Sequence, residues 1–397
     1  MGKSAKEIVW VASSLILAGS VRIEQYDSLS GILSVWDALL PHRHPLHSSR
    51  LIYLEHAQLP YVRFRYMLIY NEDGHLVAQA YFQLTEFFLP HYRYPLLQWA
   101  PLRWLEKQLM QHRRHIATCG NLFQVAAPGL VLHTSDPSLR HAAFELIADT
   151  VDAFNPAPNL LLFKDWPDEE PADLLTGRGY RRFGENGTMV LEVRPDWSHF
   201  SDYVAAMRHR YAQRVRKARR LRNGLSCHEA TLSEIEAHAG RLEQLYRNVA
   251  EKQALRLVWA NAAYFKELKR SLGQAARMFF YCRDGNIIAF RTEIVHKQEL
   301  ELHLIGIDYR FNTTHWLYFN ILYDAIESAI SLGMPRLEMG RTAPYAKLIA
   351  GAEKKHFVHY YRMHGFVARI MSRFLLAVYK KNIRRKAFAS LRIFRGQ

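Results

Sequence analysis

The amino-acid sequence predicts an α/β protein in which one unit of mixed β-sheet and packed helices occurs twice. A turn at residues 73–78 (DGHLVA) recurs at 284–289 (DGNIIA), and each copy lies between runs of β-forming residues. Asp-Gly in that setting is a strong hairpin signal, because glycine accepts the positive φ that the turn requires. The same order of elements follows both turns, and 397 residues with 49% hydrophobic content supply two cores of ordinary size.

Each half is predicted as a hairpin followed by a strand, a helix and a strand. In the first half these elements are residues 61–70, 79–87, 122–132, 137–154 and 159–163. In the second half they are residues 277–282, 290–295, 300–308, 315–332 and 336–340. A strand, a helix and a strand joined by short links indicate a parallel pair with a right-handed crossover. Each half is therefore expected to form a mixed sheet covered by helices.

The elements predict an N-terminal domain over residues 1–195, a C-terminal domain over 196–365 and a basic amphipathic tail over 366–397. Residues 8–21 are apolar and follow two lysines, which leaves a buried N-terminal element or a targeting segment. Their length is short of the about 20 residues that span a bilayer, so the buried element is favoured. Three cysteines without metal-ligand spacing favour a reducing compartment and packing roles.

The net charge of +16 is concentrated in two segments. Residues 208–222 hold eight Lys and Arg and no acid, on a predicted helix beginning near Ser201 with an apolar stripe at Tyr203, Met207, Tyr211 and Val215. This helix is either a solvated interdomain element or a phosphate-binding surface. In the second case Arg214 and Lys217 are candidates for binding a phosphate-bearing substrate or donor molecule. The tail is either an interfacial or nucleic-acid-binding arm or a helix packed on the second domain.

Polar residues alternate along the strands of the second half. Period two places Arg291 and Glu293 on one face, Glu299, Glu301 and His303 on one face, and Arg336 and Glu338 on one face. If these strands are neighbours, Glu293, Glu301, His303 and Glu338 look towards one cleft, where a carboxylate or histidine can remove a proton from an amine. The alternative is an ordinary half-exposed sheet face with paired charges.

A loop follows the last predicted strand of the second half. Residues 340–352 bring the cations Arg341 and Lys347, the hydroxyl of Thr342 and glycines that allow close backbone approach. The loop lies at the carboxyl end of a predicted parallel strand, where open α/β sheets place ligands. Arg341, Thr342 and Lys347 are therefore candidates for binding a phosphate or carboxylate of the substrate.

Four stretches of the second half resemble the acyltransferases of the GNAT superfamily. They are the basic helix at 200–218, the hairpin at 284–289, the long helix at 317–333 and the loop at 340–352. The resemblance is to the BioF2-like branch, related to the Fem-type peptidoglycan aminoacyltransferases, which carry two GNAT domains in tandem. It implies two tandem GNAT-like domains, the first degenerate, and transfer of an acyl or aminoacyl group to an amine.

One motif departs from the GNAT pattern. These enzymes bind the coenzyme A pyrophosphate in a glycine-containing turn before the central helix, whereas residues 309–315 contain no glycine. Asn312, Thr313 or Thr314 remains available to cap the helix or meet an anion. In the first half Asp136 lies at the equivalent place and would repel a pyrophosphate. Acyl-coenzyme A and aminoacyl-tRNA therefore both stay open as donors.

The expected mechanism is direct attack by an amine on an activated acyl carbonyl, without a metal. Glu301, His303 or Glu338 would remove the proton, while Arg341 and Lys347 would position the substrate. The acceptor is expected to be a small-molecule or lipid-linked amine, with tRNA or an anionic membrane meeting the basic segments, in the cytoplasm or at the inner membrane face. A non-catalytic phosphate- or membrane-binding module and a structural role in cell-envelope assembly are the alternatives. The duplication is expected to consist of a scaffold half, which is the first, and a working half, which is the second.

Overall fold

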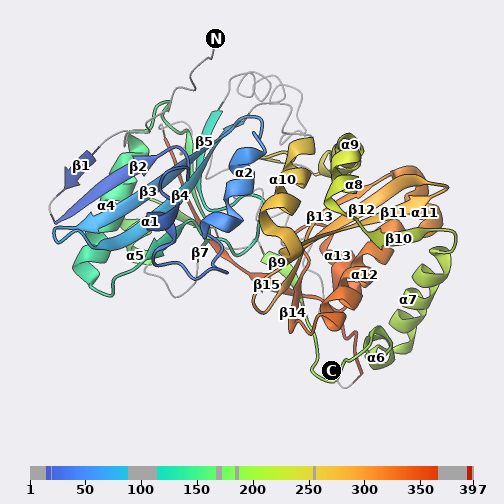
Figure 1. The fold of residues 1–397 in the computed structure, drawn as a ribbon. Helices are drawn as coiled ribbons and strands as arrows, with labels where there is room; N and C mark the ends of the chain where they lie inside the picture. Colours follow the sequence, from blue (N-terminus) through green and yellow to red (C-terminus); the bar gives the residue numbers. More distant parts are fainter. Residues whose placement is uncertain are drawn as a thin grey trace, which may run out of the picture.

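The computed structural model describes residues 15–18, 20–87, 114–166, 172–183, 187–253, 256–364 and 391–395. This part of the chain forms two lobes, each built on a mixed sheet with helices packed against it (Figure 1). The predicted fold class, mixed α/β with two such units, is confirmed.

The first sheet has the strand order β1-β2-β3-β4-β5-β7-β16-β8, with β6 paired to β4. Its strands are β1 (Leu15–Ala18), β2 (Val21–Tyr26), β3 (Val62–Asn71), β4 (Leu76–Phe87), β5 (Arg114–Cys119), β6 (Leu130–Leu132), β7 (Leu160–Trp166), β8 (Arg181–Phe183) and β16 (Val358–Met363). The helices of this lobe are α1 (Leu33–Asp37), the 3-10 turn η1 (Ser48–Arg50), α2 (Ile52–His56), α4 (Pro137–Asp152) and α5 (Ala172–Gly177).

The second sheet has the strand order β10-β11-β12-β13-β14-β9-β15. Its strands are β9 (Gly187–Glu192), β10 (Ser226–Glu229), β11 (Ala276–Arg283), β12 (Asn286–Val295), β13 (Leu300–Ile307), β14 (Arg336–Glu338) and β15 (Glu353–His356). The helices are α6 (Phe200–Ala206), α7 (His209–Leu221), α8 (Leu232–Ala237), α9 (Ala239–Ala250), α10 (Ala262–Leu272), η3 (Gly273–Ala275), α11 (Tyr309–His315), α12 (Leu317–Ser331) and α13 (Pro344–Ile349).

Both predicted Asp-Gly hairpins are present, but their turns differ. In the second, Asp284 and Gly285 both have positive φ (48° and 74°) and join β11 directly to β12, as in a type I′ turn. In the first, Gly74 has φ of 81° while Asp73 does not share the left-handed region. There the Asn71 side chain accepts from the backbone N–H of His75 at 2.8 Å, so a longer loop closes the hairpin.

The two sheets exchange strands. β9 comes from the N-terminal half of the sequence but pairs with β14 and β15 in the second sheet. β16 comes from the C-terminal half but pairs with β7 and β8 in the first sheet. The sheets therefore do not follow the predicted boundaries at 195/196 and 365/366, which remain predictions for the domains themselves. The exchange ties the lobes together twice.

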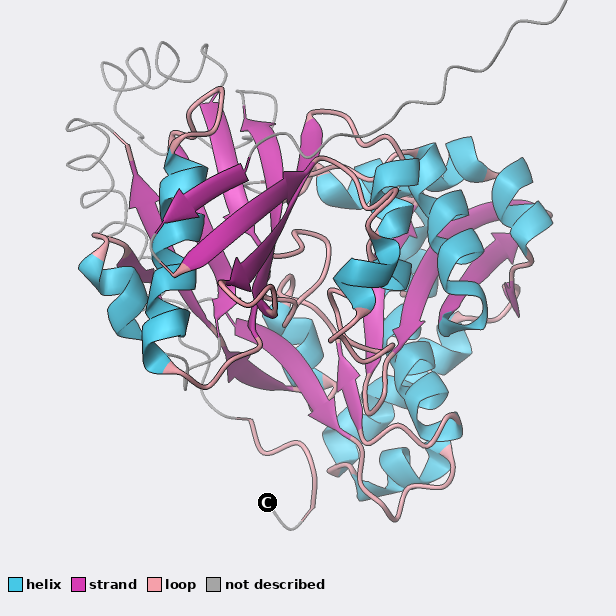
Figure 2. Ribbon diagram, turned by 60° about the vertical axis from the view of Figure 1, so that its left-hand side comes forward, coloured by secondary structure: helices cyan, strands magenta, loops and turns pink. Residues whose placement is uncertain are grey.

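A shared hydrophobic core also joins the lobes. It contains Tyr53 and Leu54 of α2 together with Tyr264 and Phe265 of α10, and the two helices lie side by side between the lobes (Figures 1 and 2). The Asn261 side chain donates to the carbonyl of Ala57 at 2.9 Å across the same contact. Separate cores fill the far faces, under α4 in the first lobe and under α7 and α12 in the second.

Two predicted elements are wrong. Residues 122–132 form a loop that ends in the short β6, and the strand parallel to β7 is β5. The loop crosses Pro128, which lacks a backbone N–H, and Gly129, where the backbone of Gly120 and Tyr81 leaves no room for a side chain. The helix expected from Ser201 breaks between α6 and α7, where Met207 is extended (ψ 151°). Its stripe still packs, because Met207, like the α7 residues Tyr211 and Val215, is buried.

The predicted N-terminal segment at 8–21 lies mostly outside the described residues, and so does most of the tail at 366–397. Of the tail, Leu391–Arg395 is described, and Phe394 forms an isolated β-bridge with Met207 beside α6 and α7. Ile393 and Phe394 are buried in the second lobe. No helix within the described ranges is long and apolar enough to cross a membrane.

Candidate functional site

Two carboxylates stand opposite each other at the centre of the second sheet. β13 and β14 are parallel, with Leu300 opposite Leu337 and Glu301 opposite Glu338. Both glutamates are buried, at 5% and 4% exposure. Pairing with β14 ends there, although β13 runs on to Ile307. The strands therefore part immediately beyond the two acids, as expected for a site that admits a substrate between them.

Hydrogen bonds from two histidines hold Glu301. Its carboxylate accepts from His303 Nδ1 at 2.6 Å and from His296 Nε2 at 2.9 Å. His303 Nε2 in turn lies 2.6 Å from the hydroxyl of Tyr264 on α10, and Arg50 of the first lobe donates to His296 Nδ1 at 3.2 Å. Burial alone would raise the pKa of Glu301, but the two histidines outweigh it and lower the pKa to about 2. Glu301 is thus a fixed negative charge.

Glu338 has the opposite character. Its carboxylate accepts from the Gly340 N–H at 2.6 Å and from the Thr188 hydroxyl of the exchanged strand β9. Burial, and then the charge of Glu301, raise the pKa of Glu338 to about 7 in spite of these hydrogen bonds. A buried pair whose pKa values are pushed apart in this way supplies one ionised and one proton-exchanging group.

Lys347 lies beside Glu338 on the inner side of the loop. The ammonium donates to the carbonyl of Gly340 at 3.1 Å, and the residue is 2% exposed. Burial lowers the pKa of Lys347 to about 8, against the opposing charge of Glu338. Lys347 is therefore a buried counter-charge to Glu338, and its expected role in positioning a phosphate or carboxylate stays a prediction.

Glu293 does not belong to this cluster. Its carboxylate accepts from Arg291 at 2.7 Å, and Arg291 donates to Ser328 of α12, on the opposite face of the sheet. The cause is a bulge: Arg291 pairs with Ile305, but Glu293 pairs with Leu302. Without the extra residue in β13, Glu293 would lie opposite His303, as the alternation predicts.

The loop after β14 turns towards the first lobe. Arg341 pairs with the buried Asp165 near the end of β7, and its expected role in positioning a substrate phosphate stays a prediction. Thr342 is exposed between Arg341 and Ala343. Gly340 and Ala343 both have positive φ (80° and 49°), which gives the loop its tight course.

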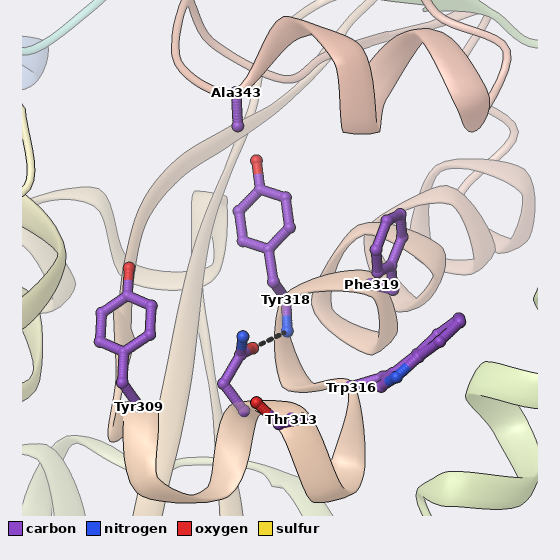
Figure 3. Close-up of a pocket in the computed structure, with 7 residues that line it drawn as sticks. Tyr309, Thr313, Trp316, Tyr318, Phe319 and Ala343 are labelled. Atoms are coloured by element: carbon purple, nitrogen blue, oxygen red, sulfur yellow. Dashed lines mark hydrogen bonds between the residues drawn. The ribbon is translucent and has the colours of Figure 1, made fainter.

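A pocket of about 410 Å³ lies beyond this loop, at the start of α12. It is lined by Tyr309, Asn312, Thr313, Trp316, Tyr318, Phe319 and Ala343 (Figure 3). The glycine-free stretch 309–315 is the helix α11, and Trp316 leaves it with φ of 45° before α12 begins. Asn312 caps α12, because its side-chain oxygen accepts from the Tyr318 N–H at 3.1 Å (Figure 3).

Cations surround the aromatic wall of the pocket. Lys217 lies 4.7 Å from the ring centre of Trp316, and Arg214 lies 4.8 Å from that of Phe319. Lys252 lies 3.0 Å from the ring centre of Tyr309 on the other side. The predicted donor-binding residues Arg214, Lys217 and Asn312 are thus brought together, away from Glu301, His303 and Glu338 but joined to them by the 340–343 loop.

The basic helix α7 is partly neutralised. Arg219 and Arg222 pair with Asp324 of α12, and Arg219 also pairs with Glu327. The acids are about a hundred residues away in sequence, so the absence of an acid within 208–222 was misleading. Within the described ranges no ion pair is formed by the exposed Arg216, Lys217 and Arg220.

The first lobe contributes residues that the sequence did not single out. Arg50, Lys164 and Asp165 come from the predicted scaffold half, and Tyr264 and His296 from the second half were also missed. Among the described residues no group of three or more His, Cys, Asp or Glu could hold a metal ion.

Comparisons with known proteins address the second lobe most directly. Residues 205–348 match the family model described as an acetyltransferase (GNAT) domain. Among solved structures, the chain is similar to FemX at 10% identity, covering 79% of this chain and 96% of that one, with a TM-score of 0.44. It is similar to a tandem GNAT protein from the clavulanic acid biosynthesis pathway at 12% identity, covering 87% of this chain and 99% of that one, with a TM-score of 0.47. It is also similar to L-PGS from Bacillus licheniformis at 12% identity, covering 83% of this chain and 92% of that one, with a TM-score of 0.45. No curated protein matches the sequence.

Proposed function

We propose that the protein transfers an acyl or aminoacyl group from an activated donor to an amine, because residues 205–348 match the family model of an acetyltransferase (GNAT) domain. The acceptor is a small-molecule or lipid-linked amine, and the donor is an acyl-coenzyme A or an aminoacyl-tRNA. The reaction takes place in the cytoplasm or at the inner face of the membrane.

The observation that carries this proposal is the pairing of Glu301 with Glu338 where β13 and β14 part. Glu338 has its pKa raised to about 7, so near neutral pH it exchanges a proton readily. Glu301 stays ionised beside it, and its charge favours an incoming ammonium group. An amine acceptor is therefore bound as a cation and deprotonated at the same place.

The pocket at α12 is the proposed site for the donor. Its aromatic wall accommodates a flat base, and Arg214, Lys217 and Lys252 supply positive charge for phosphates. Both donor classes carry an adenosine and phosphates, so the pocket supports either. Ala343 lines the pocket, and Gly340 in the same loop binds Glu338, which supports a donor orientation with the activated carbonyl towards the acids.

In the proposed step the bound ammonium group first gives one proton to Glu338, which releases it to solvent, and the neutral amine nitrogen then attacks the acyl carbonyl and forms a C–N bond. The amine proton passes to the Glu338 carboxylate, and the thioester C–S or ester C–O bond breaks. The leaving thiolate or alkoxide takes a proton, which Glu338 returns. Lys347 keeps a positive charge beside Glu338 while that carboxylate is ionised. Proximity supplies much of the acceleration, because both donors are already activated.

The test compares two Glu→Gln variants, one at the acid pair and one outside it. Glu338→Gln is expected to lower turnover about 10²- to 10⁴-fold with either donor class. Glu299→Gln is the control, since Glu299 lies on the loop before β13 and pairs with Arg336 away from the strand gap. Acyl transfer is measured by mass spectrometry against panels of acyl-coenzyme A, aminoacyl-tRNA and amines. Full turnover in Glu338→Gln would overturn the proposed base.

The exposed cations of α7 favour a second candidate, a module that binds phosphate-bearing surfaces without catalysis. Arg216, Lys217 and Arg220 are exposed without an acidic partner among the described residues. This candidate requires salt-sensitive binding to tRNA or anionic vesicles, lost when the three are neutralised, and no transfer from any donor. Transfer activity that survives neutralisation of these residues would exclude it.

A further inference from the structure

Asp165 is a buried aspartate whose hydrogen bonds converge from both lobes. It lies one residue before the end of β7, is 2% exposed, and pairs with Arg341 of the second lobe and with the neighbouring Lys164. Its carboxylate also accepts from the Ala126 N–H at 3.1 Å. Its φ is 55°, a conformation that costs a non-glycine residue free energy and persists only where the surroundings enforce it.

The exchanged strand β16 contributes to that enforcement. The Asp165 N–H donates to His359 Nδ1 at 3.0 Å, and His359 is 3% exposed. Lys164 also donates to the carbonyl of Gln124, so the same corner includes the loop between β5 and β6. Asp165 is therefore fixed by its own lobe before Arg341 reaches it.

On the other side of the ion pair, Arg341 belongs to the loop that connects the two parts of the site. Gly340 donates its N–H to Glu338 at 2.6 Å and accepts from Lys347 at 3.1 Å. Ala343 lines the pocket. Both Gly340 and Ala343 have positive φ, a conformation that costs free energy at the non-glycine Ala343, so contacts from outside the loop are needed to hold its backbone. The ion pair with Asp165 is its anchor outside the second lobe.

We propose that Asp165 is a positioning residue, which acts through Arg341 to hold the 340–343 loop so that Gly340 binds Glu338 and Ala343 closes the pocket. The lobe without the acid pair thereby sets the geometry of the lobe that has it. The proposal rests on the proposed function for its effect on turnover, but its structural content is separate.

The test uses the full chain with Asp165→Asn, Arg341→Gln and the double variant. Asp152→Asn is the matched control, because Asp152 pairs with Arg362 of the same exchanged strand but does not touch the loop. Hydrogen exchange followed by mass spectrometry is expected to rise in peptides spanning 338–347 for all three variants and to stay unchanged there in Asp152→Asn. If Asp165→Asn fails to fold, Arg341→Gln, which alters a residue with 22% side-chain exposure, decides the outcome alone.

Turnover provides a second readout. Loss of the Gly340 hydrogen bond removes a contact that lowers the pKa of Glu338, so the acid limb of the kcat/KM profile is expected to shift to higher pH. We expect kcat to fall about tenfold, with the double variant no worse than either single variant. An unchanged loop in Arg341→Gln, or equal loosening in Asp152→Asn, would overturn the proposal. Absence of turnover in the unaltered protein would instead count against the proposed function alone.

Discussion

The two lobes share the order hairpin, strand, helix and strand, and they differ most in how far their parallel strand pair extends. In the first sheet the parallel pair β5 and β7 is continuous over four residue pairs, from Ile116 opposite Leu160 to Cys119 opposite Phe163. In the second, the parallel pair β13 and β14 ends after two pairs, at the two glutamates. A long apolar pair makes a core, whereas a pair that stops early leaves a gap with polar groups at its end. The candidate catalytic residues therefore lie where the strand pairing of the sheet is interrupted.

The largest expected effect tests the acid pair. Transfer by the unaltered protein should rise with pH through about 7, because Glu338 accepts a proton only when ionised and its pKa is raised to about 7. Glu338→Gln should remove this limb of the kcat/KM profile. Thr118→Val tests the equivalent parallel pair of the first sheet, where Thr118 lies opposite Leu162 and its buried hydroxyl has no hydrogen-bond partner among the described residues. It should leave the profile intact, and a shift there would break the comparison.

A smaller effect is expected at the pocket beside α12 in the second lobe. Trp316→Ala removes the ring on which Lys217 and Arg214 lie, and should weaken donor binding about tenfold in isothermal titration. Arg220→Ala removes a cation from the same helix without touching the pocket, and should change affinity less than twofold at moderate salt. Equal losses in the two variants would point to diffuse charge and not to a defined pocket.

The helix caps should separate stability from binding. Asp136 caps α4 by accepting from the N–H groups of Ser138 and Leu139, and Asp136→Ala should cost about 1 kcal/mol of unfolding free energy in urea titrations. Asn312→Ala should cost a similar amount and also release the Tyr318 N–H at the pocket. Affinity for inorganic pyrophosphate should rise more in Asn312→Ala than in Asp136→Ala, because Arg214 and Lys217 lie beside that pocket. An equal rise in the two variants would remove the distinction between the lobes.

The smallest effect concerns the repeated turn. Asp284 has φ of 48°, so Asp284→Gly relieves a left-handed aspartate and should be close to neutral in thermal unfolding. Asp73 is not left-handed, so Asp73→Gly gains no relief and should lose about 0.5–1 kcal/mol through greater freedom of the unfolded chain. Equal costs at the two positions would show that the turns are closer in energy than their φ values indicate.

Local patterns predicted much of this fold, and pairings between distant residues escaped prediction. The hairpins, α4, α12 and the stripe through Met207 depend on signals within a few residues. The strand at 122–132 was wrong because an apolar run crossing Pro128 also suits a buried loop. Glu301, His303 and Glu338 were brought together as expected, but Glu293 was displaced by a one-residue bulge that the alternation does not reveal.

The partners of the site were harder to predict than its members. Asp165 reaches Arg341 over 176 residues, and Arg219 reaches Asp324 over 105. A single sequence carries no signal for such contacts, because each depends on the relative placement of finished elements. For the same reason the sequence suggested that Arg341 was free and that the basic helix was uncompensated.

The exchange of β9 and β16 also constrains how the chain can be made. The first sheet lacks β16 until residue 363 has been made, so its neighbours β7 and β8 each keep an unpaired edge until then. β9, in contrast, is made long before its partners β14 and β15. Neither sheet is therefore complete until residues from both halves of the sequence have been made. We therefore expect this protein to aggregate readily when it is overexpressed, and we expect aggregation to begin at the unpaired edges of β7 and β8.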